Sequence, residues 1–146
     1  MIRPLVASLS VLGLVACMAA STPPAAAEQP SEYTLTVTAP APLKVAEKGS
    51  FLIAVDVKPG YHWNDEYPAT FTVNGAPAEL GLTKALLAQL SGDFKSQSPT
   101  TVRVPVEAKP TAATDAKLTV DAHFSVCNER VCLLKNATAT VQVVAR

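Results

Sequence analysis

Residues 116–132 read AKLTVDAHFSVCNERVC, and this stretch decides both the fold class and the candidate site. Apolar side chains recur at every second position from Leu118 to Phe124, with polar or charged residues between them. This period of two is that of a β-strand with one buried face. Continued along the strand, the same parity places Val126 inward and Cys127 outward, unless a bulge intervenes.

The two cysteines at the end of this stretch are predicted to close a hairpin. Residues Asn128 to Val131 make a four-residue loop, so Cys127 and Cys132 become opposed residues of neighbouring strands. Opposed Cβ atoms lie about 4.5–5.5 Å apart and a disulfide needs about 3.5–4.5 Å, so a bridge is feasible, with strain that would favour reduction. By the chain-entropy estimate, a disulfide across so short a loop stabilises the fold by only about 2 kcal/mol. This small value favours a redox role, and a purely structural disulfide remains the alternative.

The charges beside the pair do not favour a strongly nucleophilic thiolate. Glu129 and Arg130 cancel each other, and no helix N-terminus is predicted nearby to lower a thiol pKa. The pair is therefore expected to be attacked by a partner's thiolate, or oxidised on docking, and not to be a self-sufficient enzyme.

Other alternating segments predict an all-β, immunoglobulin-like antiparallel β-sandwich with at most one short helix. The predicted strands are residues 33–38, 51–57, 71–73, 101–107, 116–124 and 137–143. Pro105 favours an edge position for its strand. The helix is predicted over Thr83–Leu90, with Thr83 as N-cap and Gly92 near its end. A length of 146 residues suits one domain, and twelve prolines against six glycines favour extended segments.

The N-terminus carries an export signal. The apolar run from Leu5 to Ala16 follows a single positive charge and is shorter than the ~20 residues of a membrane span. It ends in the sequence LVAC, which matches a bacterial lipobox, so residues 1–16 are expected to be a lipoprotein signal peptide and Cys17 the lipidated residue. Cleavage after Ala27 is the alternative, and it would give a secreted periplasmic protein.

Residues 17–31 are then a flexible tether, and residues 32–146 form the folded domain. Lipidation would anchor the protein to the periplasmic side of the bacterial cell envelope, with Met18 slightly favouring the outer membrane. Export also places Cys127 and Cys132 where disulfides persist. The balanced charge, 12 basic against 12 acidic residues, gives no basis for binding nucleic acid.

A metal site is the main alternative chemistry for the cysteines. Together with His62 and His123 they have the composition of a Cys₂His₂ set, but the spacing matches no common zinc motif. Neither a metal nor another cofactor is expected.

Several segments together carry a family resemblance. They are VKPGYHW at residues 57–63, GDFK at 92–95, TVRVPV at 101–106, LTV at 118–120, the two cysteines, and ATVQV at 139–143. In this order and spacing, roughly Phe51 to Val144 resembles the N-terminal periplasmic domain of the thiol:disulfide interchange protein DsbD. The departures are a loop one residue shorter, and Leu133 and Leu134 where that family has prolines.

The resemblance implies that the cysteines pass electrons between thioredoxin-like periplasmic partners. It also implies that Phe94 covers the disulfide, that Tyr61 and Trp63 line the site, and that Asp93 influences thiol ionisation. Core packing is the alternative for the three aromatic residues. Without the family's transmembrane and thioredoxin domains, the chain is expected to receive electrons from another protein. The competing hypothesis is a lipid-anchored binding or structural module with an inert disulfide.

Overall fold

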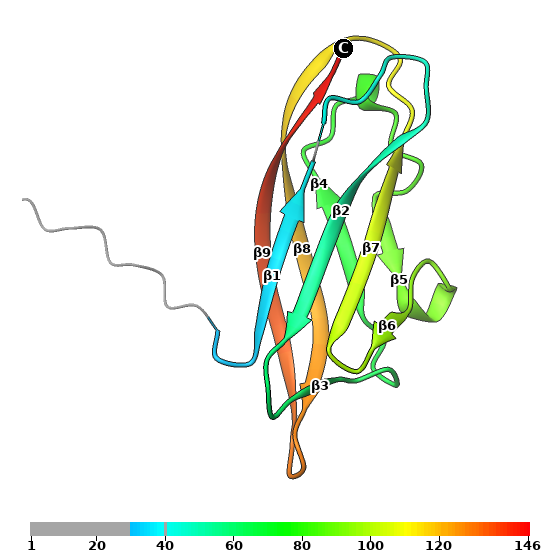
Figure 1. Cartoon of the computed structure of the whole chain (residues 1–146). Coiled ribbons are helices and arrows are strands. Elements are labelled where there is room, and N and C mark those ends of the chain that lie inside the picture. Colours follow the sequence, from blue (N-terminus) through cyan, green and yellow to red (C-terminus); the bar gives the residue numbers. More distant parts are fainter. Residues whose placement is uncertain (1–29, 40) are drawn as a thin grey trace, which may run out of the picture.

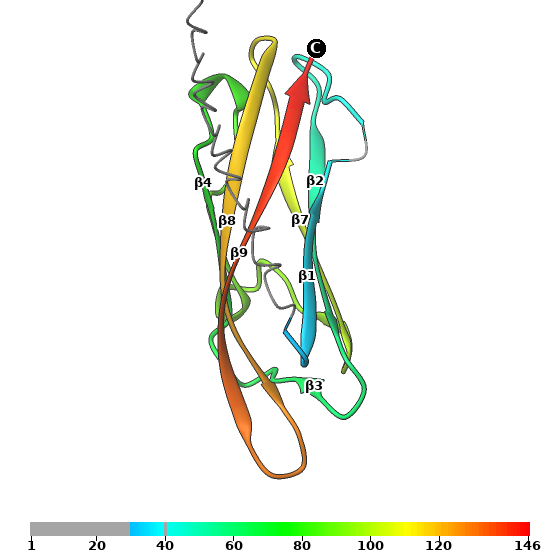
Figure 2. The ribbon, with the colours of Figure 1, turned by 90° about the vertical axis from the view of Figure 1, so that its left-hand side faces the viewer.

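A computed structural model describes residues 30–39 and 41–146 of the chain. The expected signal peptide, the expected lipidation site Cys17 and the expected tether as far as residue 29 lie outside the described residues. The described part is an antiparallel β-sandwich of two sheets (Figures 1 and 2), which confirms the predicted fold class. Within it, no helix is long and apolar enough to cross a membrane.

The first sheet has the strand order β1-β2-β7-β6, and the second has the order β3-β8-β4-β5, with β9 paired to β8. In the first sheet the strands are β1 (Tyr33–Thr38), β2 (Gly49–Val57), β6 (Ser96–Ser98) and β7 (Thr101–Ala108). In the second they are β3 (His62–Trp63), β4 (Thr70–Asn74), β5 (Leu86–Ala88), β8 (Thr114–Cys127) and β9 (Cys132–Ala145). Two short 3₁₀ turns, η1 (Ala78–Leu80) and η2 (Gln89–Ser91), complete the described elements.

The β8–β9 hairpin is the longest feature of the molecule. Both strands have 14 residues, and they pair without a break from Thr114 opposite Ala145 to Cys127 opposite Cys132. The tip of this hairpin projects beyond β3 at one end of the sandwich (Figure 1). The cysteine pair is therefore held at the end of a long, continuously paired ribbon.

The predicted alternation along β8 is confirmed by burial. The inward residues of β8 are fully buried: Leu118, Val120, Ala122, Phe124 and Val126. Phe124 is the centre of an aromatic cluster, with ring centroids 4.9 Å from Tyr33, 5.2 Å from Trp63 and 6.5 Å from Phe71. These contacts join both sheets across the core beneath the hairpin.

Pro105 occupies the half of β7 that has one strand neighbour. It lies opposite Leu52 of β2, whereas β6 pairs only with Thr101 and Val102 at the other end of β7. The edge-strand prediction is therefore right at Pro105 and wrong at the two ends of β7, where β6 pairs with one end and Leu82 bridges Ala108 at the other. A residue without an N–H is tolerated where no second neighbour needs a donor.

The helix predicted over Thr83–Leu90 is wrong. The segment contains strand β5, and its last residues enter the turn η2. β5 pairs with β4, and its side chains alternate, since Leu87 is buried and Leu86 is 55% exposed. Sheet pairing satisfies the backbone here, and it outweighs the local helix signals of a threonine and a glycine.

Candidate functional site

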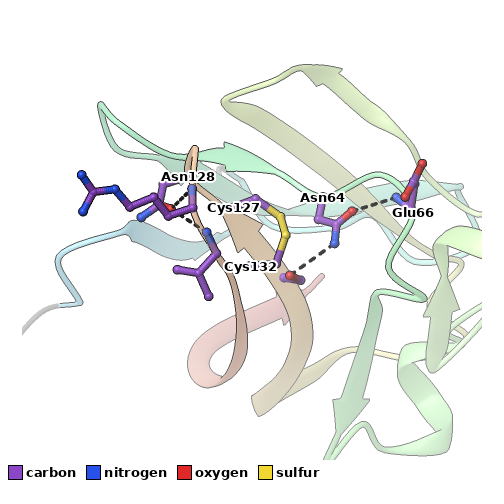
Figure 3. Close-up of a disulfide and its surroundings, with 8 residues drawn as sticks. Asn64, Glu66, Cys127, Asn128 and Cys132 are labelled. Carbon is purple, nitrogen blue, oxygen red and sulfur yellow. Dashed lines mark hydrogen bonds between the residues drawn. A yellow bond between two sulfur atoms is a disulfide. The ribbon is translucent and has the colours of Figure 1, made fainter.

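The hairpin loop predicted between the cysteines is present, and Asn128 organises it. The backbone N–H of Asn128 donates to the carbonyl oxygen of Val131 at 2.9 Å. Its side-chain oxygen accepts from the backbone N–H groups of Arg130 and Val131, at 2.8 and 2.9 Å. A side chain that binds its own loop in this way fixes a tight turn. Cys127 and Cys132 therefore face each other in register and form a disulfide, with Cα atoms 3.9 Å apart (Figure 3).

The two sulfur-bearing residues differ in exposure. Cys127 is only 5% exposed, whereas Cys132 is an exposed residue. Cys127 lies on the central strand β8, between His62 of β3 on one side and Cys132 of β9 on the other. In the described part of the chain, Cys132 has a strand neighbour only on the β8 side, because β9 is an edge strand there. A reagent from solution can therefore approach Cys132 more easily than Cys127.

The polar segment after β3 is attached to β8 beside the disulfide. The backbone N–H of Asn64 donates to the carbonyl oxygen of Ser125 at 3.0 Å, and its side-chain amide donates to the Ser125 hydroxyl at 3.4 Å. Ser125 is fully buried, and it shares the parity of Cys127 along β8. The Asn64 side chain also accepts from the backbone N–H of Glu66 at 3.1 Å (Figure 3). These bonds hold this segment next to the cysteine pair.

Of the predicted lining residues, Trp63 is in the core behind the site. It lies opposite Val126, is 2% exposed and stacks on Phe124. Its indole N–H donates to the side-chain oxygen of Gln89 at 3.1 Å. Tyr61 is half-buried against the same core. Core packing, the alternative for both residues, therefore describes them, and Trp63 supports the site from its inner face.

Phe94 belongs to the hydrophobic core and does not cover the disulfide. It is 7% exposed, and its ring meets Phe71 edge-on with centroids 5.2 Å apart. Phe71 lies opposite Ala122 of β8, which is about 17 Å along the strand from Cys127. Ala122 faces the core and Cys127 has the opposite parity. The cap expected from the family resemblance is thus replaced by core packing, the alternative weighed for this residue.

Asp93 is bound within its own loop. Its carboxylate accepts a hydrogen bond from the Lys84 ammonium and another from the Ala88 backbone N–H, the latter at 3.0 Å. The Lys84 hydrogen bond, followed by the one from Ala88, holds the pKa of Asp93 below its ordinary value. Ala88 pairs with β4, which meets β8 at His123, four residues before Cys127. The carboxylate therefore closes this loop, and the structure does not bring it to the cysteines.

An ion pair fastens the start of the domain to β9. Lys135 lies 3.2 Å from the Glu32 carboxylate, and both side chains are mostly buried. Burial alone would raise the pKa of Glu32, but hydrogen bonds, first that from Lys135, outweigh it and lower the pKa. Lys135 has the parity opposite to Cys132, so this ion pair is on the other face of β9 from the disulfide.

Sequence reasoning considered His62 only as a candidate metal ligand and missed its position beside Cys127. It lies directly opposite Cys127 in the β3–β8 pair, and its side chain is exposed. The other histidine, His123, comes four residues before Cys127 on β8, and its Nδ1 is hydrogen-bonded to the Asn136 side chain. Within the described residues, no three histidine, cysteine or acidic side chains gather as a metal site would require. No local signal pairs residue 62 with residue 127, because that pairing is made only by the folded sheet.

Comparisons with known proteins do not assign the chain to a family. No protein-family model and no curated protein matches it. Among solved structures, it is similar to AggA, the major subunit of aggregative adherence fimbriae type I from Escherichia coli. The match has 13% sequence identity and a TM-score of 0.40, and it covers 83% of this chain and 100% of that chain. A likeness of this size supports no conclusion about function.

Proposed function

We propose that this protein is an exported thiol–disulfide relay that exchanges electrons with thioredoxin-like partners through Cys127 and Cys132. The observation that carries the proposal is the asymmetry of the disulfide at the tip of the projecting hairpin. Cys132 is exposed, while Cys127 is 5% exposed. A disulfide with one accessible sulfur directs an attacking thiolate to that sulfur and defines the leaving group.

The exchange proceeds in two steps that balance atoms and electrons. A partner thiolate attacks the Cys132 sulfur, so that a partner–Cys132 disulfide forms and the Cys127–Cys132 bond breaks. The electron pair of the broken bond leaves on the Cys127 sulfur. The partner's second thiolate then attacks its own bridged sulfur and releases the Cys132 thiolate. The partner is oxidised to a disulfide and this domain is reduced to a dithiol, and the reverse sequence passes the two electrons on.

The surroundings of the pair suit a disulfide that is attacked by others. Among the described residues, neither short 3₁₀ turn lies at the hairpin tip that carries the cysteines (Figure 1), so no helix N-terminus is available there to activate a thiolate. The attacking thiolate is therefore assigned to the partner, which a thioredoxin-like protein with a low thiol pKa provides. Val131 and Leu134, 48% and 66% exposed, flank Cys132 and offer apolar contact to a docked partner.

Export and lipid anchoring belong to the same proposal. The LVAC sequence ending at Cys17 supports lipidation there, with residues 1–16 removed. The domain would then work at the periplasmic side of the cell envelope, where a disulfide persists until a dedicated partner reduces it.

The test is a trapping experiment with the oxidised domain. A thioredoxin-like protein whose resolving cysteine is changed to serine is expected to form a mixed disulfide, which peptide mapping assigns to Cys132. The matched control is the Cys127→Ser variant with its Cys132 thiol alkylated, which is expected to form no adduct. Absence of any adduct with the unmodified domain, together with a reduction potential below about −300 mV, would show an inert brace and favour the binding-module hypothesis.

A further inference from the structure

The position of His62 bears on how easily the Cys127 thiolate leaves the disulfide in the relay. His62 is paired with Cys127 across β3 and β8, so the two residues are directly opposed. Opposed residues of an antiparallel pair have Cβ atoms about 4.5–5.5 Å apart and direct their side chains to the same face. The buried sulfur of Cys127 thus lies between a disulfide partner on β9 and an imidazole-bearing residue on β3.

We propose that the protonated ring of His62 stabilises the Cys127 thiolate as it leaves the disulfide. The inference rests on the relay function, and it identifies the group that controls its pH dependence. When a thiolate attacks Cys132, negative charge develops on the Cys127 sulfur. An imidazolium beside that sulfur lowers the free energy of the thiolate and can then give it a proton. The products are a neutral Cys127 thiol and a neutral imidazole, so charge and protons balance.

The other charged groups near the pair are directed elsewhere. They are Asp65 and Glu66 after β3, Glu129 and Arg130 in the loop, and Lys135 on β9. The Asp65 carboxylate accepts from the Ser96 hydroxyl at 2.7 Å, and Glu66 lies beyond Asn64, away from the disulfide (Figure 3). Lys135 is bound to Glu32 on the other face of β9.

The two loop residues are exposed and of opposite sign. Their effects on a charge at Cys127 therefore largely cancel, and solvent screens both. Tyr61, also next to His62, is half-buried against the core. Histidine is the side-chain type whose charge ordinarily changes between pH 5 and 8. His123 is on the same face of β8 as Cys127 but four residues, about 14 Å, along the strand, whereas His62 is directly opposed to Cys127.

The experiment measures the rate of disulfide reduction by dithiothreitol between pH 5.5 and 8.5. At each pH, the rate of the unmodified protein is divided by the rate of the variant. This ratio cancels the effect of reagent ionisation, which is the same for both proteins. Imidazoles are charged below about pH 6.5. A positive charge at the distance of an opposed residue lowers a thiol pKa by about one unit or more. A thiolate of lower pKa leaves faster. The unmodified protein is therefore expected to be reduced about threefold faster than His62→Gln at pH 5.5, and at the same rate at pH 8.5.

Two further variants separate charge from structure. His62→Lys carries its charge across the whole range, so its reduction is expected to be fast at pH 5.5 and to stay about threefold faster than His62→Gln at pH 8.5. His123→Gln removes the other histidine and is expected to match the unmodified protein at every pH. Since His62 and His123 are both exposed, all three variants should keep the urea midpoint of the oxidised protein. If His62→Gln does not fold, His62→Lys is compared with the unmodified protein, and it should be reduced about threefold faster at pH 8.5.

A His62→Gln ratio that stays flat with pH overturns the inference. So does a His123→Gln ratio that follows that of His62→Gln, or a His62→Lys variant that is as slow as His62→Gln throughout. Because the reductant is a small molecule, the result does not depend on a protein partner. Failure of the trapping experiment with a pH-dependent ratio rejects the relay alone, and successful trapping with a flat ratio rejects the role of His62 alone.

Discussion

Reducing the disulfide should cost this domain little stability. The bridge joins residues separated by five positions, and chain entropy for so short a loop contributes about 2 kcal/mol to the free energy of unfolding. The pairing of β8 with β9 continues over all of both strands and does not depend on the bridge for its register. By thermodynamic linkage, the folded domain should therefore have a reduction potential only about 50 mV lower than that of its own unfolded chain.

Two measurements on the same protein check this value. Urea unfolding of the oxidised and reduced forms is followed by the fluorescence of Trp63, the single tryptophan, which is buried against Phe124. The midpoints should differ by the equivalent of about 2 kcal/mol, with the same dependence on urea. Glutathione equilibration in buffer and in urea gives the two potentials. A stability difference above about 4 kcal/mol would refute the reasoning, because the bridge would then brace tertiary structure.

Two more substitutions test the placement of residues around the site. Phe94→Ala should lower the free energy of unfolding by about 3–5 kcal/mol, because it removes a core ring packed on Phe71. It should leave the rate of disulfide reduction unchanged. Faster reduction of the folded variant would instead show that Phe94 covers the disulfide. Asp93→Asn should make the free energy of unfolding depend less on pH in the acid range. The lowered pKa of Asp93 means that its contribution is fully present above pH 3.8 and is lost as pH falls through the folded value, so urea midpoints measured at pH 2.5 and pH 6 should differ less in the variant. Equal pH dependence in both proteins would contradict the assigned hydrogen bond from Lys84.

The strands and the cysteine hairpin could be predicted because their signals are local. The period of two along β8 predicted which residues enter the core, and the four-residue loop predicted that Cys127 and Cys132 lie opposite each other. Burial of Cys127 could not be read from that parity. It arises because β3, far away in the sequence, lies alongside the end of β8.

The same limitation explains the errors at the other site residues. Phe94 is a lone aromatic residue in a polar loop, so its contact with Phe71 depends on how that loop crosses the sheet. The segment Thr83–Leu90 has helix-capping residues at its ends, but its backbone pairs with β4 instead. In each case the deciding contact is made by a strand distant in sequence, which periodicity and capping rules do not detect.

The long hairpin gives the molecule a functional polarity. The described chain enters β1 at the end that carries the disulfide, whereas Arg146 lies at the opposite end (Figures 1 and 2), about 45 Å away along a 14-residue strand. A domain attached through its N-terminal side, as the proposed lipid anchor would attach it, therefore has its disulfide at the end nearer to the point of attachment. Attachment to a sensor chip through Arg146 would instead place the cysteine pair at the end farther from the chip.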